Sequence, residues 1–150
     1  MITLKCMKLV EEARLPTYAT EGAAALDFYC VAREPVTVYP GAAVVLHTGL
    51  AVEVPAEHVL LLFSRLGHGF KFDVRLGNCV GVIDADYRGE VLVKLACDDM
   101  ATCDEAPLII EHGDRIAQGI VLPRPRVECV EVDGLTGTTR GLFGLGSTGR

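Results

Sequence analysis

The sequence predicts an all-β protein, a jelly-roll-like barrel or sandwich of short strands. Apolar and polar residues alternate with a period of two in several short segments, which is typical of half-buried strands. Turn residues such as Pro40-Gly41 separate these segments at short intervals, as in sandwiches and jelly rolls. No stretch longer than about ten residues shows a 3.6-residue period, so no long helix is expected.

The first strands are expected before residue 64. Residues 2–6 alternate, and residues 23–30 end in Phe-Tyr-Cys, which favours a strand over the helix that their alanines would otherwise favour. Residues 36–39 alternate up to a Pro-Gly turn, and residues 50–54 alternate up to a proline. Residues 59–63 are apolar throughout, which indicates a strand buried on both faces.

The second half begins with Ser64, the expected N-cap of a short helical turn that ends near His68. An apolar run at 80–83, a polar turn at 84–89 and alternating residues at 91–97 then predict a β-hairpin. The remaining strands are expected at 108–110, 116–122 and 127–132.

The domain organisation is expected to be simple. Residues 1–133 suit one β domain with a single core. From 134 to 150, glycine, threonine and serine dominate and core-forming side chains are few, which predicts a flexible C-terminal arm. No apolar run approaches the roughly 20 residues of a membrane span, and the N-terminus lacks a signal-peptide pattern. We therefore expect a soluble, intracellular and cytoplasmic protein with no membrane partner.

Charge and cysteine content narrow the partners. The net charge of −6, with scattered basic residues, argues against nucleic acid as a partner but allows a small polyanionic ligand. The six cysteines form no C-x-x-C pair and no cluster with histidine. A zinc site is therefore not expected, and the thiols are interpreted as reduced.

Two aspartates are candidates for chemistry. Asp84 ends an apolar strand, where a carboxylate beside a pocket suits a general base. Asp27, alone after a run of alanines, is a weaker candidate of the same kind. Asp84 and Asp86 would share a face on a regular strand and bind a metal together. In a turn they would diverge, and Asp86 would then be structural. No histidine has an evident partner, so the histidines are interpreted as surface or packing residues.

The C-terminal arm contains a glycine-rich segment at 144–149 that formally matches G-x-G-x-x-G. A dinucleotide site needs a strand before this motif and a helix after it, and only one residue follows here, so we reject that interpretation. Two alternatives stay open: a loop that cradles phosphate with Arg140, and a disordered tail.

Five segments in order resemble the motifs of the trimeric deoxyuridine triphosphatase (dUTPase) family. They are residues 22–27, 64–67, 81–89, 113–118 and 140–149. The resemblance covers most of the chain and implies a jelly roll that forms a homotrimer. It also implies three active sites at subunit interfaces, an arm that closes over the ligand, and hydrolysis of dUTP to dUMP and pyrophosphate.

The resemblance also implies a role for each site residue. Asp84 would activate the water that attacks the α-phosphorus, Asn78 and the adjacent backbone would bind uracil, and Tyr87 would pack under the deoxyribose. Mg²⁺ would be held mainly by the triphosphate, with Asp27 contacting it through water at most. The substrate-binding residues would be Arg65, Leu66, Gly67, Asn78, Gly81, Val82, Ile83, Tyr87, Gln118, Arg140, Phe143, Gly144, Leu145, Gly146 and Ser147.

Some positions depart from the family pattern. Leu66 replaces a serine, Phe143 replaces a glycine, Leu145 replaces a stacking aromatic residue, and Ala25 replaces a glycine. A hydroxyl bound to an ionised phosphate contributes ~1.5–3 kcal/mol, so its loss corresponds to roughly 10- to 150-fold in rate or affinity. These departures motivate an alternative, a weakened or inactive trimer that acts as a regulatory or protein-binding module. A dCTP deaminase shares the fold, but residues 84–89 argue against it.

Overall fold

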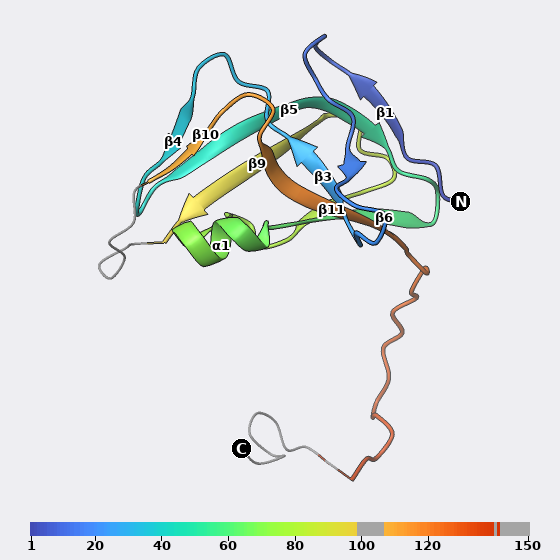
Figure 1. Cartoon of the computed structure of the whole chain (residues 1–150). Coiled ribbons are helices and arrows are strands. Elements are labelled where there is room, and N and C mark those ends of the chain that lie inside the picture. Colours follow the sequence, from blue (N-terminus) through green and yellow to red (C-terminus); the bar gives the residue numbers. More distant parts are fainter. Residues whose placement is uncertain (99–106, 140, 142–150) are drawn as a thin grey trace.

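The structure, a computed structural model, describes residues 1–98, 107–139 and 141. It consists of antiparallel sheets that face each other, with one short helix at the side (Figure 1). The predicted all-β class is confirmed. In chain order the elements are β1 (Lys5–Lys8), β2 (Thr17–Tyr18), β3 (Leu26–Tyr29), β4 (Val36–Val38), β5 (Ala43–Glu53), β6 (His58–Phe63), α1 (Leu66–Phe72), β7 (Val74–Leu76), β8 (Gly81–Ile83), β9 (Glu90–Cys97), β10 (Leu108–Ile110) and β11 (Arg115–Pro123).

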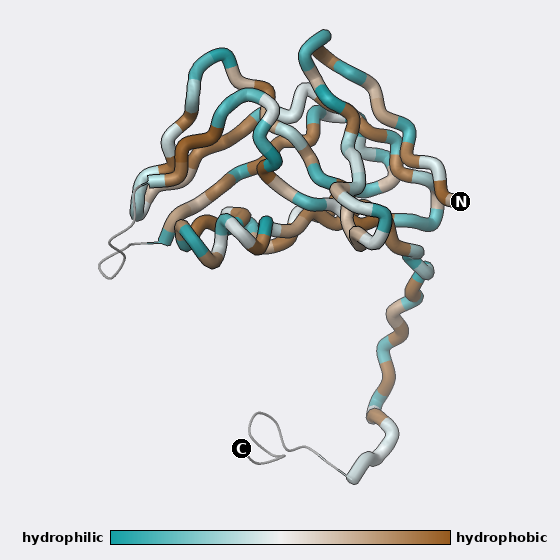
Figure 2. The backbone as a smooth tube through the Cα atoms, in the orientation of Figure 1, coloured by the Kyte–Doolittle hydropathy of each residue, from teal (hydrophilic) through white to brown (hydrophobic). Residues whose placement is uncertain are grey.

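Two larger sheets enclose the core. One has the strand order β1-β5-β9-β7, and the other has the order β2-β3-β11-β6-β8. Strand β10 pairs with β4 in a separate two-stranded sheet. The apolar stretches of the tube in Figure 2 run along the strands of both larger sheets. In β9, Val91, Val93, Leu95 and Cys97 are all buried, which confirms the face predicted from their alternation.

Gly119 marks the tightest point of this core. A Cβ added there would lie 2.6 Å from Cε2 of Phe28 and 3.0 Å from Cδ1 of Leu60. Phe28 and Leu60 are both fully buried. Burying a side chain of this size contributes about 1.5–3 kcal/mol, so a glycine here lets two core side chains close over β11.

Residues 80–97 correct the predicted hairpin. They form a strand, a turn and a strand, but β8 pairs with β6, whereas β9 pairs with β5 and β7 in the other sheet. The turn at 84–89 therefore crosses between facing sheets, which lie ~10 Å apart. Arg88 fastens it by donating to the carbonyl oxygens of Ala85 (2.7 Å) and Tyr87 (2.9 Å).

The start of α1 also differs from the prediction. Arg65, not Ser64, is the N-cap residue, and no side chain caps the helix. The Ser64 hydroxyl accepts a hydrogen bond from the backbone N–H of Leu76 (2.9 Å) and so links the start of the helix to β7. The helix continues beyond His68 and ends at Phe72, before Asp73 in the left-handed region (φ 50°).

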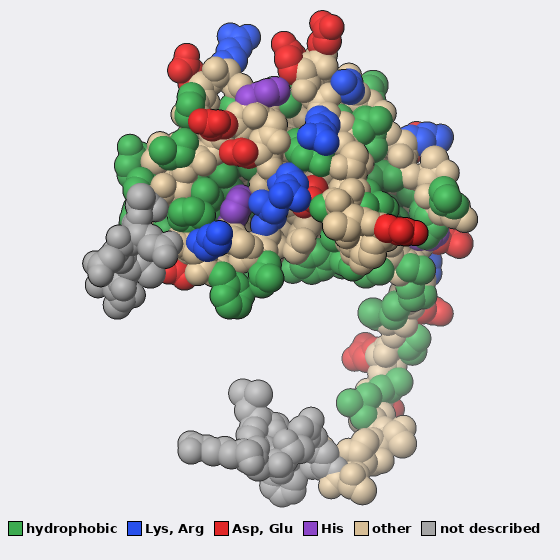
Figure 3. Space-filling view, in the orientation of Figure 1, with side chains coloured by type: hydrophobic (Ala, Val, Ile, Leu, Met, Phe, Trp, Pro, Cys, Tyr) green, Lys and Arg blue, Asp and Glu red, His purple; other side chains and the backbone are tan. Residues whose placement is uncertain are grey.

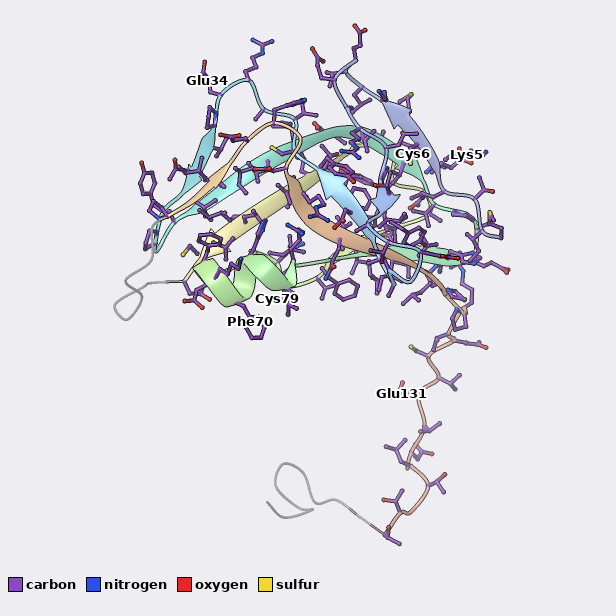
Figure 4. The ribbon with its side chains drawn as sticks, viewed as in Figure 1. Lys5, Cys6, Glu34, Phe70, Cys79 and Glu131 are labelled. Atoms are coloured by element: carbon purple, nitrogen blue, oxygen red, sulfur yellow. The ribbon has the colours of Figure 1, made fainter. Side chains whose placement is uncertain are left out.

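The predicted strand at 127–132 is wrong for the single chain. Residues 124–139 contain no helix or strand, and Val127 and Val130 are 80% and 69% exposed. The segment runs away from the sheets, with Glu131 along its length (Figure 4). Its valines favour a strand, but within the described chain the backbone has no partner strand. The arm boundary at 134 stays a prediction. No helix among the described residues has the length and apolarity to cross a membrane.

Candidate active site

Strand pairing brings three distant sequence segments together. Strand β11 lies between β3 and β6, and Gln118 is the register partner of both Asp27 and Phe63. Side chains of directly paired residues lie on the same face of a sheet. Ser64 and Arg65 follow Phe63 at once, so positions 27, 64–65 and 118 meet at one end of the five-stranded sheet.

These residues form the arginine cluster, defined as Asp27, Ser64, Arg65, His68, Arg115 and Gln118. Asp27 is buried, and its Oδ2 lies 3.1 Å from Nη1 of Arg115, while its Oδ1 lies 3.8 Å from Nε of Arg65. Arg65 Nη1 also donates to the carbonyl oxygen of Arg115 (3.3 Å). Gln118 donates from Nε2 to the carbonyl oxygen of Ser64 (2.9 Å).

The arginine cluster carries more positive than negative charge. Two guanidinium groups face one carboxylate, and Figure 3 shows Lys and Arg side chains gathered near the middle of this face. A guanidinium presents several N–H donors in a fixed fork that matches phosphate oxygens. The cluster is therefore suited to binding an anion with several phosphate groups.

His68 belongs to this cluster, although the sequence indicated only a surface or packing histidine. It is buried, and its Nε2 lies 3.5 Å from Nη1 of Arg65. Burial lowers the pKa of His68, the charge of Arg65 lowers it further, and Asp114 acts in the opposite direction. The signal in the sequence was the spacing of three from Arg65, which places two residues on one side of a helical turn.

Leu66 and Gly67 begin α1 at the surface beside the arginine cluster. Leu66 is 72% exposed, and a Cβ added at Gly67 would have no atom within 4 Å. Phe70, further along the helix, points away from the sheets (Figure 4). The side chain at position 66 is therefore free to take other forms without disturbing the core.

A second group of predicted residues lies on β8 and the turn before it. Asn78, Gly81, Val82 and Ile83 line a hollow of about 320 Å³ together with Leu62 and Lys94. The turn is tight, since the N–H of Val80 donates to the carbonyl oxygen of Asn78 (2.7 Å). Because β8 is the last strand of its sheet, no strand among the described residues pairs with its outer backbone groups.

Asp84 follows β8 directly and is exposed. It borders a cavity of about 680 Å³ that Asp86, Arg88 and Arg124 also line. Asp84 and Asp86 lie in a turn, so the prediction that would pair them as metal ligands on a strand does not apply. Nearby, Tyr87 donates its hydroxyl hydrogen to the carbonyl oxygen of Glu90 (2.8 Å).

Gly89 makes the position of Tyr87 achievable. A Cβ at Gly89 would lie 2.5 Å from the Tyr87 hydroxyl oxygen and 2.7 Å from Cζ of the ring. Tyr87 is 41% exposed, so part of its surface remains accessible to a ligand. Position 89 is therefore a glycine because the Tyr87 side chain packs over it and leaves no room for a Cβ.

The two groups of residues form separate surfaces within one chain. Ile83 pairs with Leu60, and β8 and β6 are antiparallel, so Asp84 lies opposite Val59. Ser64 is five residues further along β6, which corresponds to roughly 16 Å at ~3.3 Å per strand residue. Asp84 and the arginine cluster are therefore too far apart to touch the same phosphorus in one chain.

The donor set argues against a metal held by the protein alone. Among the described residues, no three His, Cys, Asp or Glu side chains gather in a way that could hold a metal ion. Asp27 already faces two arginines, so it suits a contact through water. The predicted residues Arg140, Phe143, Gly144, Leu145, Gly146 and Ser147 lie outside the described part of the chain.

Comparisons with known proteins show which family the chain resembles. Two deoxyuridine 5'-triphosphate nucleotidohydrolases, from Anaplasma marginale and Chlamydia caviae, are 37% and 40% identical to the chain, with 99% of each chain covered. The solved dUTPase of Staphylococcus bacteriophage 80alpha with dUPNHPP has a TM-score of 0.82 at 26% identity, with 99% of both chains covered. A mutant dUTPase of phage phi11, described with a structural Mg(II) ion, has a TM-score of 0.74 at 26% identity, with 88% of this chain and 97% of that one covered. A dUTPase family model matches residues 11–149, and the chain therefore belongs to the dUTPase family.

Proposed function

We propose that this chain hydrolyses dUTP to dUMP and pyrophosphate, as the names of its relatives state for them. The observation that carries the proposal is the segment from Asn78 to Tyr87. It joins a hollow of about 320 Å³, an open strand edge and a carboxylate within ten residues. The hollow and the strand edge would bind the pyrimidine base, and the carboxylate would activate the attacking water.

Uracil would bind in the hollow at Asn78. The open edge of β8 offers N–H and C=O groups in fixed positions, which match the alternating acceptors and donors on the edge of uracil. Cytosine reverses part of this pattern and would leave buried polar groups unpaired. Tyr87 would pack under the deoxyribose and leave no room for a ribose 2′-hydroxyl.

The arginine cluster would bind the triphosphate. Arg65 and Gln118 would donate to phosphate oxygens, together with Gly67 and, on the arm, Arg140 and Ser147. Magnesium bound by the phosphates would neutralise part of their charge, and Asp27 would contact it only through water. Phosphoryl chemistry depends chiefly on such positioning and charge neutralisation.

Asp84 would act as the general base. Its carboxylate would take a proton from a water molecule as the water oxygen bonds to the α-phosphorus. The bond from that phosphorus to its bridging oxygen breaks, and pyrophosphate leaves with the bond's electron pair. The exposed position of Asp84 at the end of β8 allows water to reach it.

We further propose that one site draws on more than one copy of the chain. Since Asp84 and Ser64 are roughly 16 Å apart along the sheet, Asp84 of one copy would complete the arginine cluster of another. A homotrimer with three such sites, closed by the arms, satisfies this requirement. The exposed apolar residues at 127–135 suit an arm that leaves its own domain.

The test is pyrophosphate release from dUTP with Mg²⁺, compared with dTTP, dCTP and UTP. We expect release from dUTP only, and a loss of at least about 100-fold in Asp84→Asn. The matched control is Asp86→Asn, an exposed aspartate two residues away, which should keep its activity. No release from dUTP, or undiminished release from Asp84→Asn, refutes the proposal. A trimer that is inactive on all four nucleotides would favour the binding-module alternative.

A further inference from the structure

We propose that His68 is a positioning residue: its unprotonated Nε2 holds the guanidinium of Arg65 in the orientation that binds substrate phosphate. The inference rests on the proposed function, because it assigns His68 a part in triphosphate binding. It goes beyond that function by giving the site a built-in sensitivity to acid.

His68 anchors the helix that carries Arg65. It is the buried residue of α1, a helix of seven residues. The N–H groups of His68 and Gly69 both donate to the carbonyl oxygen of Arg65, at 3.1 Å and 3.2 Å. The backbone of Arg65 and the ring of His68 are therefore fixed in a single helical turn, and Phe70 points the other way (Figure 4).

Three acceptors surround the Arg65 side chain. They are Nε2 of His68 at 3.5 Å, the carbonyl oxygen of Arg115 at 3.3 Å and Oδ1 of Asp27 at 3.8 Å. The two contacts to Nη1 come from different elements, and each alone is long. Together they hold the Arg65 side chain in one orientation. Without them it would sample several rotamers, and phosphate binding would then cost conformational entropy.

The contact from Nε2 requires the neutral ring. A neutral imidazole that accepts at Nε2 carries its proton on Nδ1, whereas the charged ring has no acceptor left. Nδ1 is buried and has no hydrogen-bond partner among the described residues. The charge of Arg65 favours the neutral ring and that of Asp114 the charged one, while the carboxylate of Asp27 pairs with Arg65 and Arg115.

Protonation of His68 would therefore release Arg65. The ring would lose its acceptor and place a positive charge beside the guanidinium, and the burial of Nδ1 gives that charge no compensating partner. Arg65 would then turn away, and the triphosphate would bind more weakly. The KM for dUTP should rise on the acid side of neutrality.

Two substitutions separate positioning from simple packing. His68→Leu fills a similar volume without an acceptor, and should raise the KM for dUTP roughly tenfold at pH 8 with a smaller change in kcat. His68→Gln keeps an acceptor that does not titrate, and should recover most of that loss. The unmodified protein should show a rise in KM between about pH 7.5 and pH 5.5, the range in which a histidine titrates. His68→Gln should abolish this rise. Circular dichroism and solution mass should be unchanged in both variants.

The coupling to Arg65 is tested in an Arg65→Lys background. If His68 acts through Arg65, His68→Leu should add less than about twofold to the KM of Arg65→Lys. His47→Gln is the control for a histidine that is exposed and pairs with Glu90 instead, and its pH profile should match the unmodified protein. An unchanged KM in His68→Leu, or an equal loss in His68→Gln, overturns the inference and leaves dUTP hydrolysis standing. If the unmodified protein does not hydrolyse dUTP, both the inference about His68 and the proposed function are refuted.

Discussion

The ion pairs of Asp27 and Asp98 allow a quantitative test of how burial sets the stability of this fold. Asp27→Asn keeps the size of the side chain but removes the negative charge between Arg65 and Arg115. Removing one partner of a fully buried ion pair costs about 3–5 kcal/mol. Here the side chain of Asp27 is 9% exposed, but those of Arg65 and Arg115 are 25% and 43% exposed, so water screens them partly. We therefore expect a loss of about 1–3 kcal/mol.

The assay is thermal unfolding at one fixed protein concentration, because the proposed trimer would make the melting temperature depend on concentration. For a chain of this length each kcal/mol lowers the melting temperature by about 2–4 °C, so Asp27→Asn should melt roughly 2–12 °C lower. The same substitution should raise the KM for dUTP, since Arg65 and Arg115 lose the carboxylate that they share.

Asp98→Asn is the matched control. Asp98 accepts from Arg75 Nη2 (2.7 Å) and Nε (2.9 Å), a shorter and better aligned pair than that of Asp27. The hydrogen bond from Arg75 lowers the pKa of Asp98, yet both side chains are largely exposed. Asp98→Asn should therefore change the melting temperature much less than Asp27→Asn. An equal drop in the two variants would refute the reasoning from burial.

Three further predictions follow from single positions. Leu66→Ser should leave the melting temperature nearly unchanged, because Leu66 is 72% exposed, and should raise kcat/KM for dUTP by roughly 10- to 150-fold; unchanged kinetics would contradict a role for the missing hydroxyl. Gly119→Ala should lower the free energy of unfolding by about 1–3 kcal/mol in chemical denaturation, whereas Gly22→Ala, which meets no neighbour, should not. Burial, with a smaller contribution from a nearby carboxylate, raises the pKa of Cys30 to about 11, so a maleimide at pH 8 should label exposed Cys79 well before Cys30.

Period-two patterns predicted most strands because alternation reports directly which residues face a core. The alternating run at 91–97 falls within β9. The apolar run at 59–63 falls within β6, but only Leu60 and Leu62 are buried and the other residues of the run are half-buried, so the prediction of burial on both faces is wrong for the single chain. Alternation does not report which strand is the neighbour. For that reason residues 81–83 were expected to pair across a hairpin, whereas they pair with β6. The same limit explains 127–132, where valines favour a strand but the single chain supplies no partner.

The candidate site, like the fold, could be predicted from the sequence only in part. Motif order selected Asp27, Arg65 and Gln118, but their contact arises from the order β3-β11-β6, which no local pattern encodes. The role of Ser64 as a link to β7 and the contact between His68 and Arg65 depend on the same tertiary arrangement. A hydroxyl before a helix suggested a cap, yet the Ser64 hydroxyl accepts from the N–H of Leu76 and no side chain caps α1.

The separation of Asp84 from the arginine cluster has a genetic consequence. If each site combines these two surfaces from different copies, Asp84→Asn and Arg65→Ala damage different halves of the same site. Co-refolding the two inactive variants in equal amounts would then restore about a quarter of the sites, each assembled from two intact halves. Such complementation between alleles would be lost if one chain held a whole site. For the same reason, an inactive copy would inactivate the sites that it shares with active copies.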